Sequence, residues 1–181
     1  MAYNLSIKNK RMENFKEELK KIKALVFDVD GVLSKDYSPL DSTGEPMRTA
    51  NMKDGYAIRA ALSAGFQVAI ITGGVSERVK LRYKKLGVEH YYDKIWNKMD
   101  CLLDFMDKTG IDKSEIMYMG DDVLDYHVMA EIGVPTCPLD AATEIKNISK
   151  YISESKSGQG CVRDVIEQVM RAQNLWFKAN E

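Results

Sequence analysis

The chain has few cysteines and no long hydrophobic run. Its three cysteines, Cys101, Cys137 and Cys161, lie far apart and match no zinc-binding spacing. Their odd number argues against a fully paired disulfide framework, so a reducing compartment is expected. No apolar run is long enough to span a bilayer, and the lysine-rich beginning of the chain lacks the apolar core of a signal peptide. We therefore expect a cytoplasmic protein with no membrane partner.

Charge of either sign is not in excess, and histidine is scarce. Lysine and arginine total 26 and aspartate and glutamate total 27, which leaves a formal net charge of −1. Without a basic stripe, nucleic acid is not an expected partner. The two histidines, His90 and His127, have no cysteine or carboxylate cluster at ligand spacing, apart from Asp125 two residues before His127. Both are interpreted as structural or surface residues.

Segments typical of buried strands alternate with segments typical of helices. Strands are expected at 24–28, 66–72, 88–92, 115–120, 134–136 and 151–152, and helices at 54–64, 76–86, 100–109, 125–132, 141–147 and 162–173. An amphipathic lead-in helix is expected within residues 1–22, and residues 174–181 form a C-terminal tail. This alternation predicts one doubly wound α/β domain over residues 1–181, with a mostly parallel sheet covered on both faces.

Residues 34–50 interrupt this alternation. They are rich in turn-forming residues, contain Pro39 and Pro46, and include Asp41-Ser42-Thr43-Gly44 as a plausible hairpin tip. We expect two short edge strands here, forming a β-hairpin flap too small to be a separate domain. The flap is defined below as residues 34–50.

Three of the expected strands end in polar residues. Asp28 and Asp30 follow the first, Thr72-Gly73-Gly74 follow the second, and Gly120-Asp121-Asp122 end the fourth. Each group alone has an ordinary explanation as a turn or a helix cap. Because ligands bind at the carboxyl ends of the strands in doubly wound sheets, all three groups are expected at one edge. Several carboxylates there would repel one another, and hard oxygen ligands suit Mg²⁺.

These groups, with Lys98 between the second and third, resemble in order and spacing the four motifs of the haloacid dehalogenase superfamily. The flap, the stretch 51–58, Gly120-Asp121-Asp122-Val123-Leu124-Asp125 and the stretch 158–163 resemble its capless branch, which includes the 3-deoxy-D-manno-octulosonate 8-phosphate phosphatases. The resemblance covers about residues 22–175 and implies a Rossmann-like fold.

The resemblance implies the following catalytic roles. Asp28 would attack phosphorus and form an aspartyl-phosphate, and Asp30 would be the general acid and then the general base. Mg²⁺ would be held by Asp28, the backbone carbonyl of Asp30, and Asp121. Asp122 and Asp125 would orient metal-bound water and Lys98.

The resemblance also implies how the phosphoryl group is held. Thr72 and the amides of Gly73 and Gly74 would contact its oxygens, and Lys98 would neutralise their charge. Some relatives carry a bulkier basic residue where this chain has Gly74, so contact there is expected through the backbone. Ile95-Trp96-Asn97, before Lys98, replaces a stretch that is small or amide-rich in close relatives.

Residues for the sugar acid are expected on the two helices that follow the flap. The resemblance implies substrate-binding residues Asn51, Asp54, Gly55, Arg59 and Arg82, with Asp30, Gly73, Gly74 and Lys98 also touching substrate. Each arginine could equally be an exposed helix residue.

The implied function is Mg²⁺-dependent hydrolysis of a sugar-acid phosphate, 3-deoxy-D-manno-octulosonate 8-phosphate, in lipopolysaccharide precursor synthesis. A nine-carbon keto-deoxy sugar acid 9-phosphate is the alternative substrate. A receiver-like phosphoacceptor domain and an idle assembly subunit are the alternatives that are not enzymes. A homotetramer is expected, because an isolated hairpin is marginal in water and neighbouring subunits would cover each open site.

Overall fold

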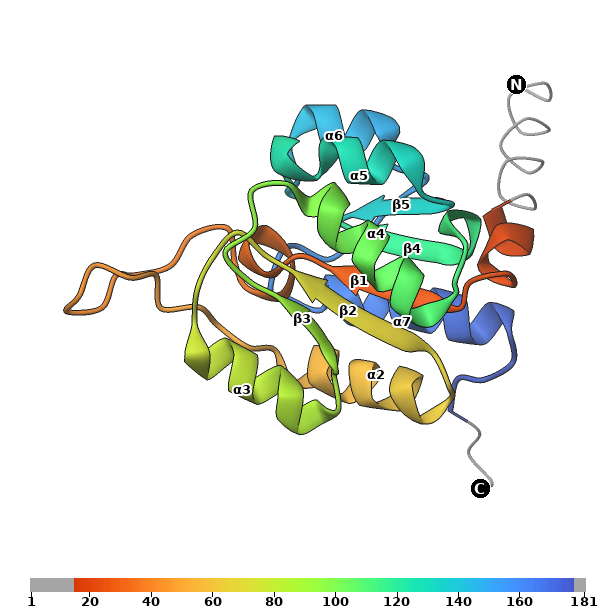
Figure 1. Ribbon diagram of the computed structural model, residues 1–181, viewed down its shortest axis with the longest axis horizontal. Helices are drawn as coiled ribbons and strands as arrows, with labels where there is room; N and C mark the ends of the chain where they lie inside the picture. The colour runs from red at the N-terminus through yellow and green to blue at the C-terminus, as the bar shows by residue number, and fades with distance from the viewer. Residues whose placement is uncertain (1–14, 178–181) are drawn as a thin grey trace.

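A six-stranded parallel sheet lies between two layers of helices in the computed structural model, which describes residues 15–177 (Figure 1). The strands are β1 (Ala24–Phe27), β2 (Gln67–Ile71), β3 (His90–Tyr92), β4 (Ile116–Met119), β5 (Val134–Cys137) and β6 (Tyr151–Ile152). Their order is β3-β2-β1-β4-β5-β6. The expected doubly wound α/β fold is confirmed. A receiver domain has the different order 2-1-3-4-5, so this topology does not support that alternative.

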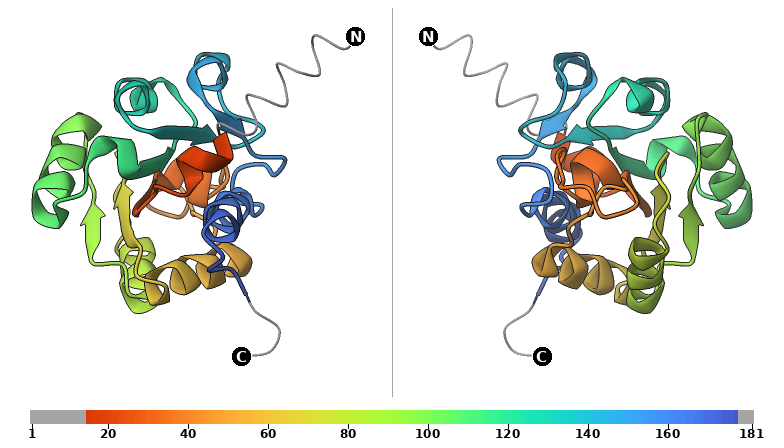
Figure 2. Two further views of the ribbon diagram at one scale, coloured as in Figure 1. Left: turned by 90° about the vertical axis from the view of Figure 1, so that its right-hand side faces the viewer. Right: turned by 90° about the vertical axis from the view of Figure 1, so that its left-hand side faces the viewer.

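The helices cover both faces of the sheet (Figure 2). They are α2 (Met52–Ser63), α3 (Glu77–Leu86), α4 (Lys98–Thr109), α5 (Tyr126–Glu131), α6 (Thr143–Ile148) and α7 (Cys161–Ala172). The turns η1 (Val29–Leu33), η2 (Lys113–Glu115) and η3 (Val123–Asp125) complete the elements. The expected ends differ from these by at most two residues; α4, for example, begins at Lys98 because Asn97 accepts a hydrogen bond from the amide of Met99.

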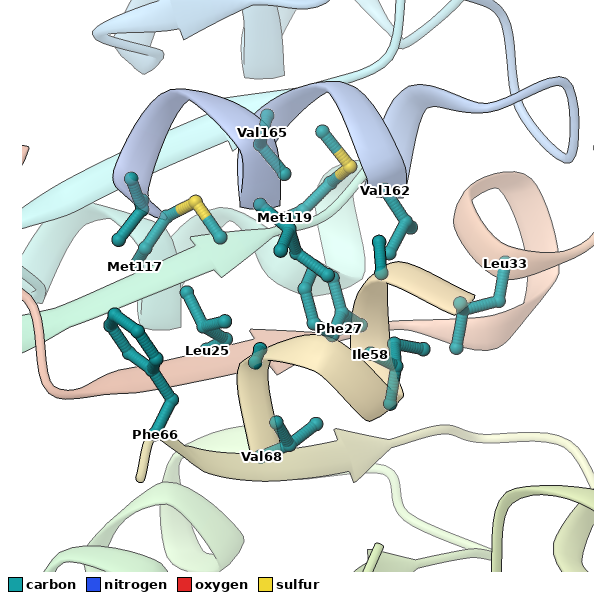
Figure 3. Packing of buried hydrophobic residues seen from close by; sticks show 14 of the residues in the cluster. Leu25, Phe27, Leu33, Ile58, Phe66, Val68, Met117, Met119, Val162 and Val165 are labelled. Carbon is teal, nitrogen blue, oxygen red and sulfur yellow. The ribbon is translucent and has the colours of Figure 1, made fainter. Parts of the chain in front are cut away.

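The two cores follow from the alternation of side chains along each strand. On one face, Leu25 and Phe27 of β1 pack with residues of α2 and α7 (Figure 3). On the other face, Ala24 and Val26 pack with residues of α4, α5 and α6. Because β1 is covered on both sides, it is apolar at every position and fully buried, and its first polar residue comes where the strand stops.

The flap projects from the body of the molecule (Figure 1). The expectation of two short strands is wrong here: a single antiparallel bridge joins Leu40 and Pro46. The tip forms as expected, with the Asp41 carboxylate accepting hydrogen bonds from the amide and hydroxyl of Thr43. Pro39 and Pro46 have no N–H to donate, which explains why the ladder does not extend.

The ends of the chain are only partly described. The lead-in helix expected within residues 1–22 lies largely outside the described residues; its described part is helical over residues 15–19. Residues 178–181 of the tail also lie outside the described residues. Between residues 15 and 177, no helix has both the length and the hydropathy needed to cross a membrane.

Candidate active site

The carboxyl ends of β1, β2 and β4 meet at one edge of the sheet, as expected from the sequence. The strands are neighbours, with Phe27 aligned to Ile70 of β2 and Met119 of β4. Beyond them lies a cavity of about 630 Å³. It is lined by Asp28, Asp30, Gly31, Asp36, Thr72, Gly73, Gly74, Ile95, Trp96, Lys98, Asp121, Asp122, Leu124, Asp125, Asp140 and Ala142.

A buried ion-pair network stands at the floor of this cavity. The Nζ atom of Lys98 lies 2.7 Å from Oδ2 of Asp28 and 2.7 Å from Oδ1 of Asp125. The side chain of Lys98 is only 2% exposed. Burial by itself would lower the pKa of Lys98, but the two carboxylates outweigh it and hold the pKa above its usual value. Lys98 is therefore a fixed cation beside Asp28.

Asp125 is the positioning residue of this network. Its Oδ1 accepts hydrogen bonds from Lys98 and, at 2.6 Å, from the hydroxyl of Tyr118. Its Oδ2 accepts the amide of Asp121 at 3.2 Å. Because both oxygens accept hydrogen bonds in this way, Asp125 orients Lys98 and the loop after β4. The Tyr118 hydroxyl was not foreseen, since strand alternation alone makes Tyr118 a core residue.

The geometry of Asp28, Asp121 and Asp125 fits a divalent cation. One carboxylate oxygen from each lies within 4.8 Å of the others. Gly31, at φ +80°, makes room for this cluster, because a Cβ atom there would overlap the Asp121 carboxylate. Hard carboxylate oxygens are the ligands that Mg²⁺ prefers.

The protonation of the cluster also fits a cation site. Burial raises the pKa of Asp28 to about 7, with a further rise from Asp125 and an opposing effect of Lys98. Burial, together with Asp28 and Asp125, raises the pKa of Asp121 to about 8. These carboxylates repel one another in a poorly hydrated place, and a bound divalent cation would offset that repulsion.

The loop after β2 lies across the same cavity. Thr72 is buried, and its hydroxyl oxygen accepts the amide of Gly74 at 3.1 Å. Its own proton therefore remains available to a ligand oxygen. Asp122 is exposed at the rim, where it caps the amide of Val123. Trp96 also stands at the rim and is 87% exposed.

Five of the residues expected to bind substrate do not line the cavity of a single chain: Asn51, Asp54, Gly55, Arg59 and Arg82. Asn51 caps α2 and donates to the carbonyl of Gly158, and Asp54 is buried with its Oδ1 accepting the amide of Arg163. Gly55 packs under Arg82, whose guanidinium is 3.5 Å from the sulfur of Met52. Arg59 is exposed. Asn51, Asp54, Gly55 and Arg82 thus lie where α2 contacts α3, α7 or the loop before α7.

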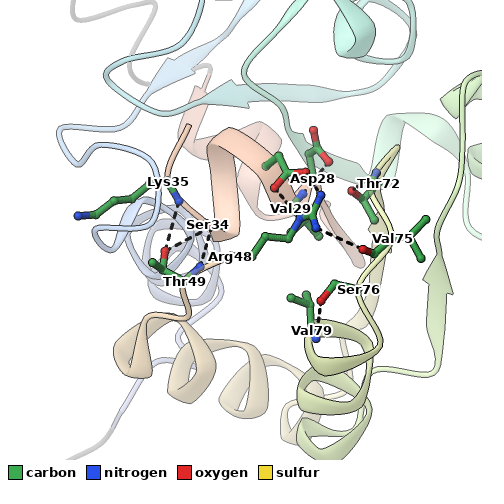
Figure 4. A network of polar contacts seen from close by, with 12 residues as sticks. Asp28, Val29, Ser34, Lys35, Arg48, Thr49, Thr72, Val75, Ser76 and Val79 are labelled. Atoms are coloured by element: carbon green, nitrogen blue, oxygen red, sulfur yellow. Dashed lines mark hydrogen bonds and ion pairs between the residues drawn. The ribbon is translucent and has the colours of Figure 1, made fainter. Parts of the chain in front are cut away.

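Arg48 of the flap is a site residue that the sequence analysis missed. Its Nε and Nη2 atoms each lie 2.8 Å from one of the two oxygens of Asp30, and its Nη1 donates to the carbonyl of Val75 at 3.3 Å (Figure 4). The arginines expected to bind substrate, Arg59 and Arg82, are on the helices after the flap. A signal was present, because Arg48 is the one arginine of the flap.

Comparisons with known proteins agree with this geometry. The model of the haloacid dehalogenase-like hydrolases matches residues 56–138. The 3-deoxy-D-manno-octulosonate 8-phosphate phosphatase KdsC of Escherichia coli (strain K12) is 36% identical over 152 residues, which are 84% of this chain and 81% of that protein.

Two solved structures show the same fold. The 3-deoxy-D-manno-octulosonate 8-phosphate phosphatase of Moraxella catarrhalis, in complex with a magnesium ion, a phosphate ion and KDO, matches with a TM-score of 0.86 at 32% identity, over 90% of this chain and 94% of that one. The Yersinia pestis enzyme matches with a TM-score of 0.85 at 30% identity, over 88% and 86%. The chain therefore belongs to the haloacid dehalogenase superfamily, in the family of the 3-deoxy-D-manno-octulosonate 8-phosphate phosphatases.

Proposed function

We propose that this protein is a Mg²⁺-dependent phosphatase that releases phosphate from 3-deoxy-D-manno-octulosonate 8-phosphate. The observation that carries the proposal is the ion-pair network of Asp28, Lys98 and Asp125 at the floor of the cavity. Asp28 lines this cavity together with Asp30 and Asp121. The names of the relatives in Escherichia coli and Moraxella catarrhalis support the choice of substrate.

Asp28 is the proposed nucleophile, and its carboxylate would attack phosphorus to form an aspartyl-phosphate. Lys98, 2.7 Å away, would hold that carboxylate in place and neutralise charge as the phosphoryl group approaches. Lys98 is itself fixed by Asp125, so the cation does not have to be reorganised during the reaction. Splitting hydrolysis into two displacements explains why a second acid is needed beside the first.

Asp30 is the proposed general acid and base. It would give a proton to the leaving sugar oxygen and later take one from the water that attacks the aspartyl-phosphate. Asp28, the carbonyl of Asp30, and Asp121 would hold Mg²⁺. When bound, this ion supplies charge that offsets repulsion between the nucleophile and the phosphoryl oxygens. Asp122 is proposed to orient water around that site from the rim.

The loop after β2 is the proposed cradle of the phosphoryl group. The hydroxyl of Thr72, whose oxygen already accepts the Gly74 amide, has its proton free for a phosphoryl oxygen. The amides of Gly73 and Gly74 add further donors once substrate competes for them.

Five residues proposed to bind the sugar acid are not among the described residues that line the cavity. Asn51, Asp54, Gly55, Arg59 and Arg82 lie outside the cavity lining, so their proposed role in substrate binding depends on a neighbouring subunit, or on support of the flap and of α2. The flap exposes Tyr37, Leu40 and Met47, which suits burial between subunits. A homotetramer in the cytoplasm is the proposed state.

The assembly can be tested by deleting residues 38–46. This deletion is expected to dissociate the tetramer and to remove selectivity for sugar acids, and light scattering with activity assays would report both. A wild-type protein that is a selective, active monomer would contradict the proposed assembly.

The substrate can be tested with a panel of phosphate monoesters assayed with Mg²⁺. The proposal expects the highest kcat/KM with 3-deoxy-D-manno-octulosonate 8-phosphate, and lower values with hexose and nucleotide monophosphates. A preference for a nine-carbon keto-deoxy sugar acid 9-phosphate would favour the alternative substrate within the same chemistry.

A further inference from the structure

Arg48 brings a cation from the flap into contact with the proposed general acid. Its side chain is only 7% exposed, while the side chain of Asp30 is 46% exposed. The guanidinium is held at three points: the two oxygens of Asp30 and the carbonyl of Val75. A two-pronged pair of this kind is among the stronger and more directional charged contacts in proteins.

This pairing competes with proton transfer by Asp30. Both oxygens of Asp30 accept a hydrogen bond from Arg48, so the guanidinium occupies one acceptor site on each oxygen. To protonate a leaving oxygen, or to accept a proton from water, Asp30 directs one oxygen at that group. Release of an Arg48 contact would free that oxygen for the transfer.

The absence of a side chain on Gly74 makes room for the guanidinium of Arg48. A Cβ atom on Gly74 would overlap Nη2 of Arg48 and would lie 2.9 Å from Oδ2 of Asp30. The missing side chain lets the guanidinium lie directly against the Thr72–Gly74 loop, the proposed cradle of the phosphoryl group. A phosphoryl group bound by this loop would therefore lie next to Asp30, within reach of the Arg48 guanidinium.

The excess of negative charge in the cavity favours a further cation such as Arg48. Among the described residues that line it there are seven aspartates, and Lys98 is the only lysine or arginine. Lys98 is already paired with Asp28 and Asp125. A phosphate monoester carries up to two negative charges near neutral pH, so one divalent cation leaves the site with an excess of negative charge.

We propose, on the basis of the phosphatase function above, that Arg48 is a substrate-binding residue that holds Asp30 in the resting enzyme and moves to an oxygen of the substrate's phosphoryl group. The exchange frees Asp30 for proton transfer only when a phosphoryl group is present. The guanidinium of Arg48, which comes from the flap, thus occupies the space that a side chain on residue 74 would fill.

The first test is binding of inorganic phosphate in the presence of Mg²⁺, measured by calorimetry on Arg48→Gln, Arg48→Lys and the matched control Arg78→Gln. Arg78 lines a second cavity, between the flap and α3, and makes no hydrogen bond or ion pair with Asp30 in the described part of the chain. Arg48→Gln is expected to weaken phosphate binding at least tenfold, Arg48→Lys to recover part of that loss, and Arg78→Gln to stay within twofold of the wild type. Circular dichroism checks that each variant is folded.

The second test uses the steric relationship between the two residues. Gly74→Ala is expected to displace Arg48 and weaken phosphate binding in the wild type, but to add little further loss in the Arg48→Gln background. Two fully additive losses would contradict a shared mechanism, because residues that act through one contact show coupling in a double-mutant cycle.

The third test separates the phosphoryl group from the sugar acid. Arg48→Gln is expected to raise KM for a small aryl phosphate without a carboxylate, as well as for the sugar-acid phosphate. An effect confined to the sugar-acid phosphate, or wild-type phosphate binding and KM in Arg48→Gln, would overturn the inference. Failure of the wild type to release phosphate from any monoester with Mg²⁺ would instead contradict the proposed function.

Discussion

The ammonium group of Lys98, on the first turn of α4, lies 2.7 Å from a carboxylate oxygen of Asp28 at the end of β1. The same ammonium group lies 2.7 Å from Asp125, and all three side chains are almost fully buried. One buried cation thus compensates two buried carboxylates, and it does so at the position where the phosphoryl group is proposed to bind. This arrangement couples the stability of the fold to its chemistry.

Replacing Lys98 by Met is expected to cost stability as well as activity. The change leaves Asp28 and Asp125 buried without their cation, and breaking a buried pair in this way costs about 3–5 kcal/mol. Urea unfolding at pH 8 in the absence of metal measures the loss. Lys113→Met is the control, since both side chains of its pair with Glu131 are more than half exposed and solvent screens such a pair. Equal losses in the two variants would contradict the importance of the buried network.

Mg²⁺ affinity is expected to rise with pH. The pKa of Asp28 is raised to about 7 and that of Asp121 to about 8, so at pH 6 both carboxyls hold protons in the metal-free protein. Mg²⁺ must displace these protons, and its Kd should therefore fall on the order of 10²-fold between pH 6 and pH 8. Calorimetry in buffers of different ionisation enthalpy would also show proton release. A Kd that is independent of pH would rule out these two residues as the titrating ligands.

Asp54 is expected to make the fold less stable as pH rises. Burial raises its pKa to about 6, against the opposing hydrogen bond from the Arg163 amide, and its Oδ2 is buried without a partner among the described residues. Because the folded pKa lies above the ordinary value of 3.8, the folded state holds the proton more tightly than the unfolded state. The stability from this proton is therefore full below about pH 4 and is lost as pH rises through 6.

Asp54→Asn removes this titration and serves as its own test. Between pH 5 and pH 7.5, the free energy of unfolding of the wild type is expected to fall by about 1–2 kcal/mol more than that of the variant. Urea unfolding across this range gives the comparison. Parallel pH profiles for the two proteins would show that Asp54 is not the titrating group.

The sequence predicted the parts of the site that follow from strand ends. Asp28, Thr72 and Asp121 each come directly after, or within two residues of, an apolar strand, and parallel pairing brings such positions to one edge regardless of detail. Asp125 and Lys98 were placed through the resemblance, and the structure adds how they hold each other. Helix caps and glycine stops likewise gave the element boundaries to within a few residues.

The remaining parts depend on contacts between segments that have no fixed spacing. Arg48 reaches Asp30 because its guanidinium lies against Gly74, a contact between distant segments that no local pattern encodes. Asn51 is a cap of α2 that also contacts the loop before α7, so a residue matched by motif lies in a helix contact. In the flap, the predicted turn is present but the two predicted strands are not, because Pro39 and Pro46 lack the N–H donors that a strand ladder needs.

The most direct test of the central claim is phosphate release from 3-deoxy-D-manno-octulosonate 8-phosphate by the wild type and by Asp28→Asn, both with Mg²⁺. Asp107→Asn, on the exposed surface of α4, is the control for changing a carboxyl to an amide. Because an amide is a poor nucleophile and a weaker metal ligand, Asp28→Asn is expected to lose kcat by at least about 10⁴-fold while remaining folded, with Asp107→Asn unchanged. Near-normal turnover by folded Asp28→Asn would contradict the account.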